Sequence, residues 1–546
     1  MKSGLKKTFQ FLKKTENEAA VELLIQSLDS KLDAVRTESL RALLERRSPA
    51  GHHAVFARLP KFDESERGII AERPDRMVRV VSEALKTADK ATCVNALKAI
   101  LTFRLYAVLP ALTAVLKTPE SPLFKPATRI IGELTEAFYL ELSGHDRPEK
   151  HRDYDTMRKR LTGTLEEAVG CYSVHESEEV LEAFLMVAKP QSAVLRRILQ
   201  SPEETVHGPL VEIMKTSQRG GVLRLLLSFL EDPQMPNVAR SILTTRDDVK
   251  FLENLAKHVG TKPKRGVLET LTTLKSLVWA RPEAPVFEEL DDACQESMVT
   301  ILVHSAVPRP QVLETIGYLL LHGKPGGRRA AARAIEQHRD AKATEFVRAA
   351  LADDDPEVLA EILPQLRVRQ VPDSLSLLIR MVDSPYEEVR TALGKAMPEF
   401  TFRQFMNNFD TMPEELLPTT GHLVRKIDLK AKAELTAELA GLSPVRRRKA
   451  VQAAAAMGMV QTLEQAIIAR LSDDDHMVRI AAAKALAECD TMPSWEALRD
   501  AMLDRSVIVQ EAAEASLMRI SQTLASNQPE DEDEGSESET EQEVLQ

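Results

Sequence analysis

The chain has 546 residues, which is beyond the size at which one hydrophobic core stops growing, so a single compact domain is excluded. Aromatic residues make up only 4% of the sequence and the apolar fraction is 43%, rich in Ala and Leu, which favours closely packed helices over sheets. Nine acidic residues and no Lys or Arg follow Ser526; removing these nine from 83 acidic residues leaves 74 against 72 basic ones. The body of the chain is therefore nearly neutral, which argues against a broadly basic nucleic-acid-binding protein.

The cysteines and the hydropathy pattern indicate the compartment. The four cysteines lie scores of residues apart and form no C-x-x-C pair, so we expect neither a disulfide framework nor a cysteine zinc site. The N-terminal residues lack the apolar core of a signal peptide, and no segment approaches the roughly 20 apolar residues that a membrane span needs. These features predict a cytoplasmic protein in a reducing environment.

The first element expected along the chain is a short basic amphipathic helix. Leu5, Phe9 and Leu12 lie at helical spacing among five lysines between Met1 and Lys14. Such a helix can lie on an anionic membrane. We favour the simpler interpretation, in which it is the first helix of a stack and packs onto the apolar residues of segment 21–25.

A polar segment between Gly144 and Asp155 holds the densest group of possible metal ligands. These ligands are His145, Asp146, His151, Asp153 and Asp155. They fall in what looks like a loop and alternate with Arg and Lys, which would repel a cation. We therefore interpret the segment as a solvated loop, and we expect no metal and no cofactor.

An internal repeat dominates the sequence from residue 323 onwards. Apolar or small residues recur at i, i+3, i+4, i+7 and i+8 starting from Val389, Val478 and Val509, the pattern of one helix face. Equivalent positions recur every 31 residues, with one step of 27, at Gly327, Val358, Val389, Thr420, Arg447, Val478 and Val509. Two helices and two turns fit this period, so the sequence predicts an array of helical hairpins.

Capping residues mark the turn inside the hairpins. Segments rich in Asp precede the second helix at Asp353–Pro356, Asp383–Pro385 and Asp473–Asp475, where Asp can accept bonds from free N–H groups and Pro suits the first turn. Asp runs could also suggest a calcium loop, but they lack the alternating ligands, central Gly and terminal Glu of an EF-hand. Arg390 and Arg479 directly follow the initial Val of their helices.

This D-x-x-V-R-x-x-A arrangement resembles the HEAT-repeat family in its short form, most clearly over residues 323–520. The resemblance implies a ladder of Asp and Arg side chains along the inner helices, including Asp475, Arg479 and Arg390. Leu359 and Gln510 replace the Arg in their repeats, so the ladder should be interrupted there, and Arg447 stands where Val is expected.

The predicted fold is an all-α superhelix, a HEAT-like solenoid in which each hairpin covers the apolar face of its neighbour. Residues 1–322 should form an irregular helical solenoid, because only Asp33–Arg36 and Asp75–Arg79 carry the signature there. Residues 323–525 should form the regular array. Residues 526–546 should be a disordered acidic tail, which we interpret as solubilising although its Ser and Thr resemble acidophilic kinase sites.

Motifs for catalysis are absent from the sequence. There is no G-x-S-x-G, no H-E-x-x-H and no P-loop spacing at Gly323–Gly327. The basic cluster Arg446–Lys449 could touch phosphates, but consecutive residues spread around a helix, so a solvated helix start is the favoured interpretation.

We therefore predict a non-catalytic scaffold that presents a concave helical surface to a protein or peptide partner, with Arg390, Arg447 and Arg479 as candidate contacts. Nucleic acid is not the expected partner. The alternative hypothesis is an enzyme or enzyme accessory similar to HEAT-like bilin lyases or DNA glycosylases. It would use a pocket around His145–Asp155 or a basic groove around Arg446–Lys449.

Overall fold

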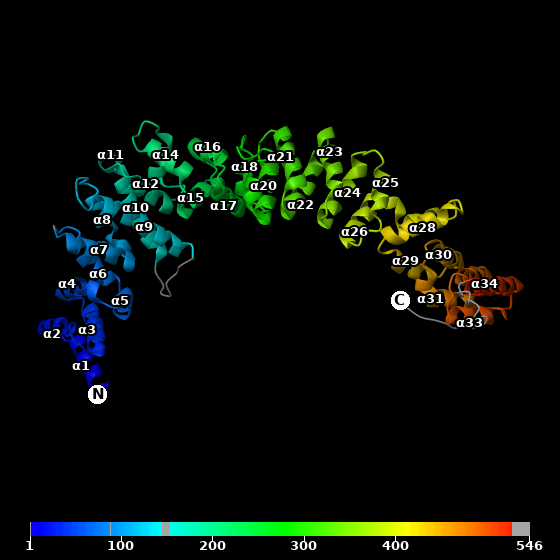
Figure 1. Ribbon diagram of the computed structural model, residues 1–546, viewed down its shortest axis with the longest axis horizontal. Coiled ribbons are helices and arrows are strands. Elements are labelled where there is room, and N and C mark those ends of the chain that lie inside the picture. The colour runs from blue at the N-terminus through cyan, green and yellow to red at the C-terminus, as the bar shows by residue number, and fades with distance from the viewer. Residues whose placement is uncertain (1, 88, 145–152, 527–546) are drawn as a thin grey trace, which may run out of the picture. The chain divides into compact units, whose positions relative to one another are not determined.

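In the computed structural model, residues 2–87, 89–144 and 153–526 are described. Within these residues the chain forms 34 α-helices, eight short 3-10 helices and no β-strand (Figure 1). The chain divides within helix α21 (Arg309–His322) into two compact units, Met1–Tyr318 and Leu319–Gln546. The prediction of an all-α helical solenoid is confirmed.

The first unit is a succession of helices that pack mainly against neighbours close in the chain. Its helices are α1 (Lys2–Lys14), α2 (Ala19–Ser27), α3 (Asp33–Arg46), α4 (Pro49–Arg58), α5 (Glu64–Ala71), α6 (Asp75–Ala84), α7 (Lys90–Thr102), α8 (Leu109–Val115), α9 (Phe124–Leu142), α10 (Tyr154–Gly170), α11 (Tyr172–His175), α12 (Glu178–Val187), α13 (Ala193–Gln200), α14 (His207–Thr216), α15 (Gly220–Ser228), α16 (Asn237–Thr245), α17 (Val249–Val259), α18 (Arg265–Leu271), α19 (Val286–Glu289) and α20 (Asp292–His304). A 3-10 turn, η2 (Tyr106–Val108), precedes α8. Helix α12 is typical, because it packs against α9, α10, α14 and α15.

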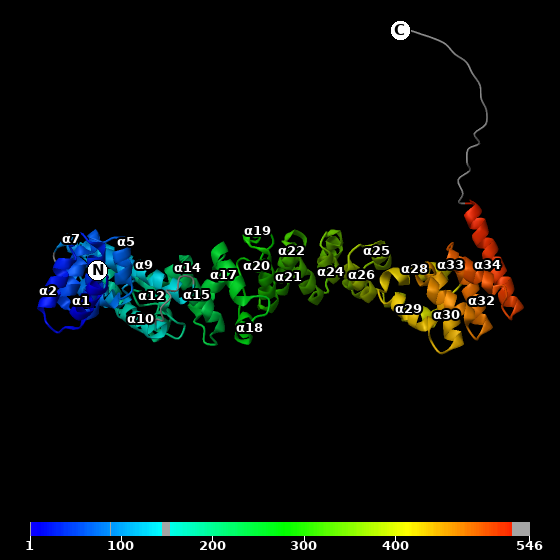
Figure 2. The ribbon, with the colours of Figure 1, turned by 90° about the horizontal axis from the view of Figure 1, so that it is seen from below.

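The second unit consists of hairpins in regular order. Its helices are α22 (Pro325–Ala334), α23 (Ala341–Ala349), α24 (Pro356–Val368), α25 (Ser374–Arg380), α26 (Glu387–Ala396), α27 (Phe402–Asn408), α28 (Leu416–Ile427), α29 (Ala431–Leu439), α30 (Pro444–Ala456), α31 (Glu464–Ile468), α32 (His476–Leu486), α33 (Met492–Ala501) and α34 (Val507–Ser526). The even-numbered helices from α22 to α34 are the second helices of the hairpins, and each packs against the next (Figure 2).

The apolar faces predicted for these second helices lie in the core. Val389, Ala392 and Leu393 are buried in α26, and Val478 and Leu486 are buried in α32. Burial of each such Val or Leu side chain contributes about 1.5–3 kcal/mol, and in a stack the neighbouring hairpin supplies the covering surface. The spacing in the sequence thus reports which residues face the next repeat.

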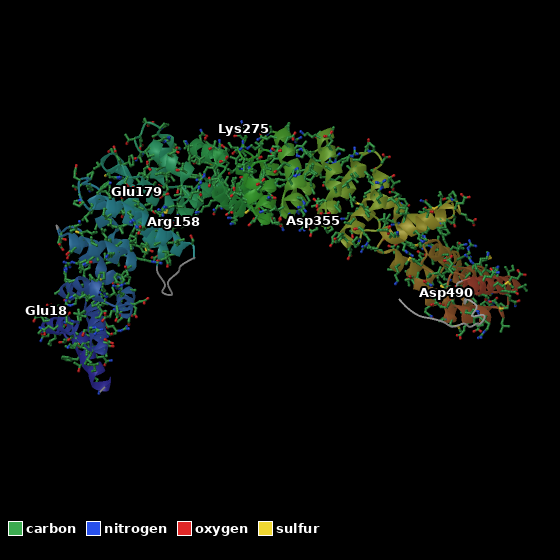
Figure 3. The ribbon with its side chains drawn as sticks, viewed as in Figure 1. Glu18, Arg158, Glu179, Lys275, Asp355 and Asp490 are labelled. Atoms are coloured by element: carbon green, nitrogen blue, oxygen red, sulfur yellow. The ribbon has the colours of Figure 1, made fainter. Side chains whose placement is uncertain are left out.

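Aspartate caps start several of these helices as predicted. The carboxylate of Asp355 accepts a bond from the N–H of Glu357 at 3.0 Å, and that of Asp475 accepts from Met477 at 2.7 Å. Asp355 is labelled in Figure 3 at the start of α24. Asp383 does not cap α26; Ser384 Oγ accepts the N–H of Tyr386 instead, at 3.3 Å.

Helix α1 forms as predicted, but its packing differs from the expectation. Phe9 is buried, whereas Leu5 and Phe11 are exposed, and the main packing partner is α3 rather than segment 21–25 in α2. Two other predictions concern residues outside those described. These are the acidic tail, predicted for residues 526–546, of which only Ser526 at the end of α34 is described, and the residues His145, Asp146 and His151. The boundary at residues 322 and 323 stays a prediction.

One glycine allows an unusually close helix approach in the second unit. Gly421 in α28 lies against the end of α30, where a Cβ atom would meet the carbonyl carbon of Ala456 at 2.7 Å and the amide nitrogen of Met457 at 2.9 Å. These atoms belong to backbone and cannot rotate away. Glycine is therefore required where the two helices meet.

We expect Gly421→Ala to lower the stability of the second unit by about 1–3 kcal/mol, because the added methyl group forces α28 and α30 apart. The change should appear as a lower urea midpoint in circular dichroism. Gly68→Ala in α5 is the matched control, since no atom lies within 4 Å of the Cβ position there. That variant should be neutral or slightly more stable. Equal midpoints for the two variants would contradict the close approach.

Candidate partner-binding surfaces

Arg479 occupies an intramolecular ion pair that joins two repeats. Its Nε and Nη2 donate to the two carboxylate oxygens of Asp504 at 2.9 and 3.1 Å, and its Nη1 donates to the carbonyls of Asp473 and Asp474 at 2.8 and 3.1 Å. The Arg479 side chain is 4% exposed and that of Asp504 is 12% exposed. The Arg479 guanidinium therefore donates hydrogen bonds both to the turn of its own hairpin and to the turn of the next hairpin.

Arg447 has the same two roles one repeat earlier. Its Nε and Nη2 both donate to Asp473 at 2.7 Å, and its Nη1 donates to the carbonyls of Gly441 and Leu442 at 3.0 and 2.9 Å. A third pair of this kind joins Arg328 to Asp353, at 2.8 and 3.2 Å. The ladder implied by the HEAT resemblance is thus present, as bidentate pairs between successive turns.

The ladder corrects two details of the sequence interpretation. The carboxylate that pairs with the arginine of the preceding repeat is that of Asp473, whereas Asp475 caps α32. Arg447 is the equivalent of Arg479, so Arg446, not Arg447, aligns with Val478. The short step after Thr420 is therefore 26 residues rather than 27, and the next step is 32. The predicted interruption at Gln510 is partial, because its amide nitrogen still donates to the carbonyl of Asp504 at 2.6 Å although the carboxylate pair is lost.

Arg390 differs from the other two candidate contacts. Its Nη1 donates to the carbonyl of Ser384 at 2.8 Å, which closes its own turn. Among the residues that the structure describes, no carboxylate lies within ion-pair distance of its guanidinium. Gly421, one repeat further on, carries no side chain that could extend the ladder. The outer edge of Arg390 is therefore available to a partner.

The basic cluster Arg446–Lys449 is largely neutralised within the fold. Arg446 lies 3.5 Å from Glu438, Arg447 pairs with Asp473, and Lys449 lies 2.8 Å from Asp410. Three of the four cations thus have carboxylate partners. The main observation in favour of nucleic-acid binding is weakened accordingly.

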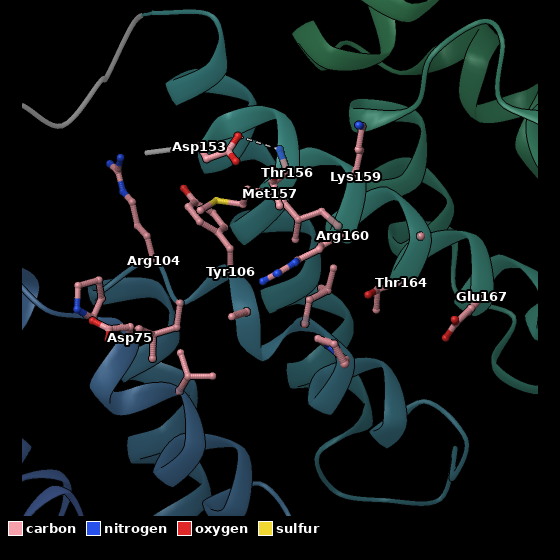
Figure 4. A pocket seen from close by; sticks show the side chains of 18 residues that line it. Asp75, Arg104, Tyr106, Asp153, Thr156, Met157, Lys159, Arg160, Thr164 and Glu167 are labelled. Atoms are coloured by element: carbon pink, nitrogen blue, oxygen red, sulfur yellow. Dashed lines mark hydrogen bonds between the residues drawn. The ribbon is translucent and has the colours of Figure 1, made fainter. Parts of the chain in front are cut away.

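A pocket lies in the first unit, against α10, and we call it the α10 pocket. Its volume is about 740 Å³. The wall is mostly apolar and comes from the start of α6, the segment through η2 to the start of α8, and one face of α10. The lining residues are Pro74, Asp75, Val78, Arg104, Leu105, Tyr106, Ala107, Leu109, Pro110, Asp153, Thr156, Met157, Lys159, Arg160, Leu161, Gly163, Thr164 and Glu167. Figure 4 shows Arg160 extending from α10 towards the turn that carries Tyr106.

A buried carboxylate holds the elements that form this pocket. Glu141, fully buried in α9, accepts bonds from Arg104 Nη1 at 2.7 Å, from the Tyr106 hydroxyl at 2.8 Å and from the Tyr154 hydroxyl at 3.4 Å. Phe138 packs edge-on against Tyr106, with ring centroids 5.3 Å apart. A buried charge is costly unless it is fully paired, so these bonds fix the η2 turn and the start of α10 relative to α9.

The charged groups at the rim of the pocket are mainly on α10. Lys159 and Arg160 are exposed, and neither forms an ion pair among the described residues. The Asp153 carboxylate caps α10 through Thr156, and hydrogen bonds from the Thr156 hydroxyl and amide lower its pKa. Glu167 on the same helix is likewise exposed and forms no ion pair among the described residues. The pocket therefore combines an apolar floor with two available cations and one available carboxylate.

A second pocket of about 360 Å³ lies along the same helix and shares Lys159 and Gly163 with the first. Arg158 lines this pocket and donates to the carbonyls of Val187 and Ala188 at the end of α12. Arg224 donates to the same helix end. Burial, together with the nearby charge of Arg158, lowers the pKa of Arg224 to about 10.

Comparisons with known proteins identify the repeat. Residues 313–397 match the family model for HEAT repeats, so this segment consists of HEAT repeats, as the sequence predicted. No curated protein sequence matches the chain.

Solved structures that resemble the chain include a Kap121p mutant, with 13% identity, a TM-score of 0.31, and coverage of 96% of this chain and 57% of that chain. Kap121p bound to Ste12p gives 14% identity, a TM-score of 0.30 and the same coverage. A structure from work on the cadherin and beta-catenin interaction gives 12% identity and a TM-score of 0.30, with 92% and 99% coverage. The chain thus spans just over half the length of Kap121p.

Two kinds of feature are absent from the part of the chain that the structure describes. No group of three or more His, Cys, Asp or Glu residues is placed so that it could hold a metal ion. No described helix combines the length and the apolar character needed to cross a membrane.

The sequence located the ladder, but it located the α10 pocket only in part. Of the described residues in the range His145–Asp155, which the alternative hypothesis named, Asp153 lines this pocket. Tyr106, Glu141 and Met157 lie on separate elements, and no motif connects them. The one available signal was the long amphipathic helix that follows the polar segment at residues 145–153.

The ladder pairs make stability depend on pH. Burial opposes ionisation of Asp504, but the bonds and charge of Arg479 outweigh it, so the pKa of Asp504 is lowered. For Asp473, the hydrogen bonds from Arg447 are the main cause of a lowered pKa. A lowered carboxylate pKa stabilises the folded state above the unfolded value, near 4, and this contribution is lost as pH falls through the folded value.

We expect Arg479→Met to destabilise the second unit by about 3 kcal/mol at pH 7, because it leaves the Asp504 carboxylate without its buried partner. The difference from the unsubstituted chain should shrink below pH 4, where Asp504 becomes protonated. Urea unfolding at both pH values measures this. Arg348→Met in α23 is the control, since Arg348 is exposed and unpaired among the described residues; it should change stability by less than about 0.5 kcal/mol.

Proposed function

We propose that this protein is a non-catalytic, cytoplasmic scaffold that binds a segment of a protein partner, with the α10 pocket as the anchor point. The observation that carries the proposal is the pocket itself, because its apolar wall is assembled from three parts of the solenoid and lies beside two cations that form no ion pair among the described residues. Binding sites for peptides typically combine an apolar floor with a few polar groups that fix orientation.

The chemistry of the pocket favours one kind of occupant. Leu105, Leu109, Met157 and Leu161 offer apolar contact, and Arg160 stands at the rim. A peptide that places an apolar side chain in the pocket and a carboxylate beside Arg160 satisfies both features. The proposed partner is therefore a protein segment with an apolar anchor next to an acidic residue.

The three arginines predicted from the repeat remain proposals for additional contacts. Arg390 is favoured, because among the described residues its guanidinium makes only the turn-closing bond to Ser384. Arg447 and Arg479 would contact a partner only through edges that the ladder leaves uncovered. Their main effect is expected to be on stability.

Several observations support a scaffold over the enzyme alternative. The described residues that line the α10 pocket include no His, Cys or Ser, which are the usual nucleophiles and bases of covalent catalysis. Asp153 and Thr156 there serve as a helix cap. The neutralised cluster at Arg446–Lys449 gives no groove for DNA.

Gly163→Leu tests the pocket directly. No atom lies within 4 Å of the Cβ position of Gly163, so leucine fits on α10 while filling space shared by both pockets. Replacing a helical glycine should also stabilise the helix by about 0.5–1 kcal/mol. We expect peptides selected on the unsubstituted full chain by display to lose at least about tenfold in affinity, as measured by fluorescence anisotropy.

Gly68→Leu is the matched control for that experiment, since Gly68 is an exposed helical glycine of α5 with the same free space. It should bind the selected peptides unchanged. Selected peptides that bind both variants equally would show that the α10 pocket is not the anchor.

Charge reversal tests the acidic character of the partner. Arg160→Glu should lower the affinity for the selected peptides about fivefold to tenfold, because an attractive charge pair becomes repulsive. The weakening of binding by salt should also become smaller. Lys250→Glu is the control and should have no effect, because Lys250 on α17 is exposed and forms no ion pair among the described residues. If the selected peptides contain no acidic residue and bind equally to both variants, the proposed acidic character of the partner is wrong.

A further inference from the structure

The last helix of the second unit has an apolar outer face that no described element covers. The buried side of α34 carries Val509, Ala513 and Ile520 towards α32. The opposite side exposes Met518, at 56%. Figure 2 shows α33 and α34 as the last helices of this unit. Terminal repeats of solenoids normally have a polar outer face, so this end is unusual.

A groove runs along this outer face between α33 and α34. Its volume is about 450 Å³, and its apolar lining is Trp495, Met502, Leu517 and Met518. Glu514 lines it as well. Glu511 lies on the same helix face as Glu514, one turn earlier, and both carboxylates are exposed and form no ion pair among the described residues. We call this the end groove; it is apolar in the middle and acidic along α34.

The other end of the chain has the complementary character. On α1, Lys7, Phe11 and Lys14 recur at i, i+4 and i+7, so they share one face. Phe11 is 69% exposed, and Phe9 on the opposite side is buried. Lys7 and Lys14 are exposed and form no ion pair among the described residues, in contrast to Lys13, which lies 3.3 Å from Glu45. The helix contains no acidic residue.

We propose that α1 of one copy of this protein packs into the end groove of a second copy and joins the copies head to tail. Phe11 supplies the aromatic side chain for the apolar groove, and Lys7 and Lys14 lie beside the carboxylates of Glu511 and Glu514. Each copy has one head and one groove, so the contact is heterologous and produces open chains or closed rings of copies. The proposal is independent of the α10 pocket.

A pair of complementary variants tests the contact on the full chain. Phe11→Asp disrupts the contact face of α1, which we call the head, and Met518→Asp disrupts the end groove. Both side chains are exposed, so the fold should be retained. Sedimentation velocity up to about 100 µM should show concentration-dependent oligomers for the unsubstituted chain and monomers for each variant alone. A mixture of the two variants should form only a one-to-one dimer, because one intact head meets one intact groove.

Two controls accompany this experiment. Tyr386→Asp changes an exposed aromatic residue at the start of α26, where Asp is a favourable cap, and should oligomerise like the unsubstituted chain. Raising the salt concentration should weaken the association, because charge pairs at an exposed rim are screened. Dimer formation in the mixture itself demonstrates that both variants are folded.

Three results would overturn the proposal. One is a monomeric unsubstituted chain at every concentration. Another is that Phe11→Asp by itself still forms dimers and that adding Met518→Asp to it abolishes them. The end grooves of two copies would then pair with each other. The third is oligomers that persist in both variants. If the intact chain is monomeric and a chain ending at Ser526 associates, residues 527–546 occupy the groove instead of a second copy.

Discussion

Each hairpin of the second unit depends on its neighbour for burial of its apolar face, and the guanidinium ladder acts on the same boundary. Arg447 and Arg479 each close one turn and hold the next, so a single side chain fixes both the local geometry and the spacing of the repeats. Apolar contact supplies most of the free energy, whereas the bidentate pairs define the register between repeats. In this arrangement stability spreads along the chain through nearest neighbours.

The sequence was sufficient for the parts of the fold that depend on local periodicity. The faces beginning at Val389 and Val478 were predictable because helical spacing alone determines which side meets the next hairpin. The ladder carboxylate was not, because Asp473 and Asp475 are both suitable residues two positions apart, and only the path of the turn decides which one meets the arginine of the previous repeat. Arg447 was misaligned for a related reason, since three consecutive arginines give no signal of register.

The α10 pocket illustrates a second limit. Its shape depends on Glu141, which binds Arg104 and Tyr106 from a preceding hairpin and Tyr154 from the next helix. A buried carboxylate on an otherwise ordinary helix resembles a solvent-exposed one in the sequence, because its partners are set by packing. Irregular repeats of this kind create cavities that a regular array would fill, which explains why the proposed anchor lies in the less regular unit.

The gap in the ladder next to Arg390 also has a thermal consequence. Between α26 and α28 there is no buried ion pair among the described residues. The ion pair between Lys426 and Asp383 does connect this part of the array, but it is exposed and contributes little. This seam is therefore held chiefly by the hydrophobic effect, which weakens on cooling, whereas the boundaries at Arg447 and Arg479 keep their ionic contacts. Near the freezing point the array should part between α26 and α28 before it parts at the boundaries of Arg447 and Arg479, so the protein contains a built-in cold-labile joint.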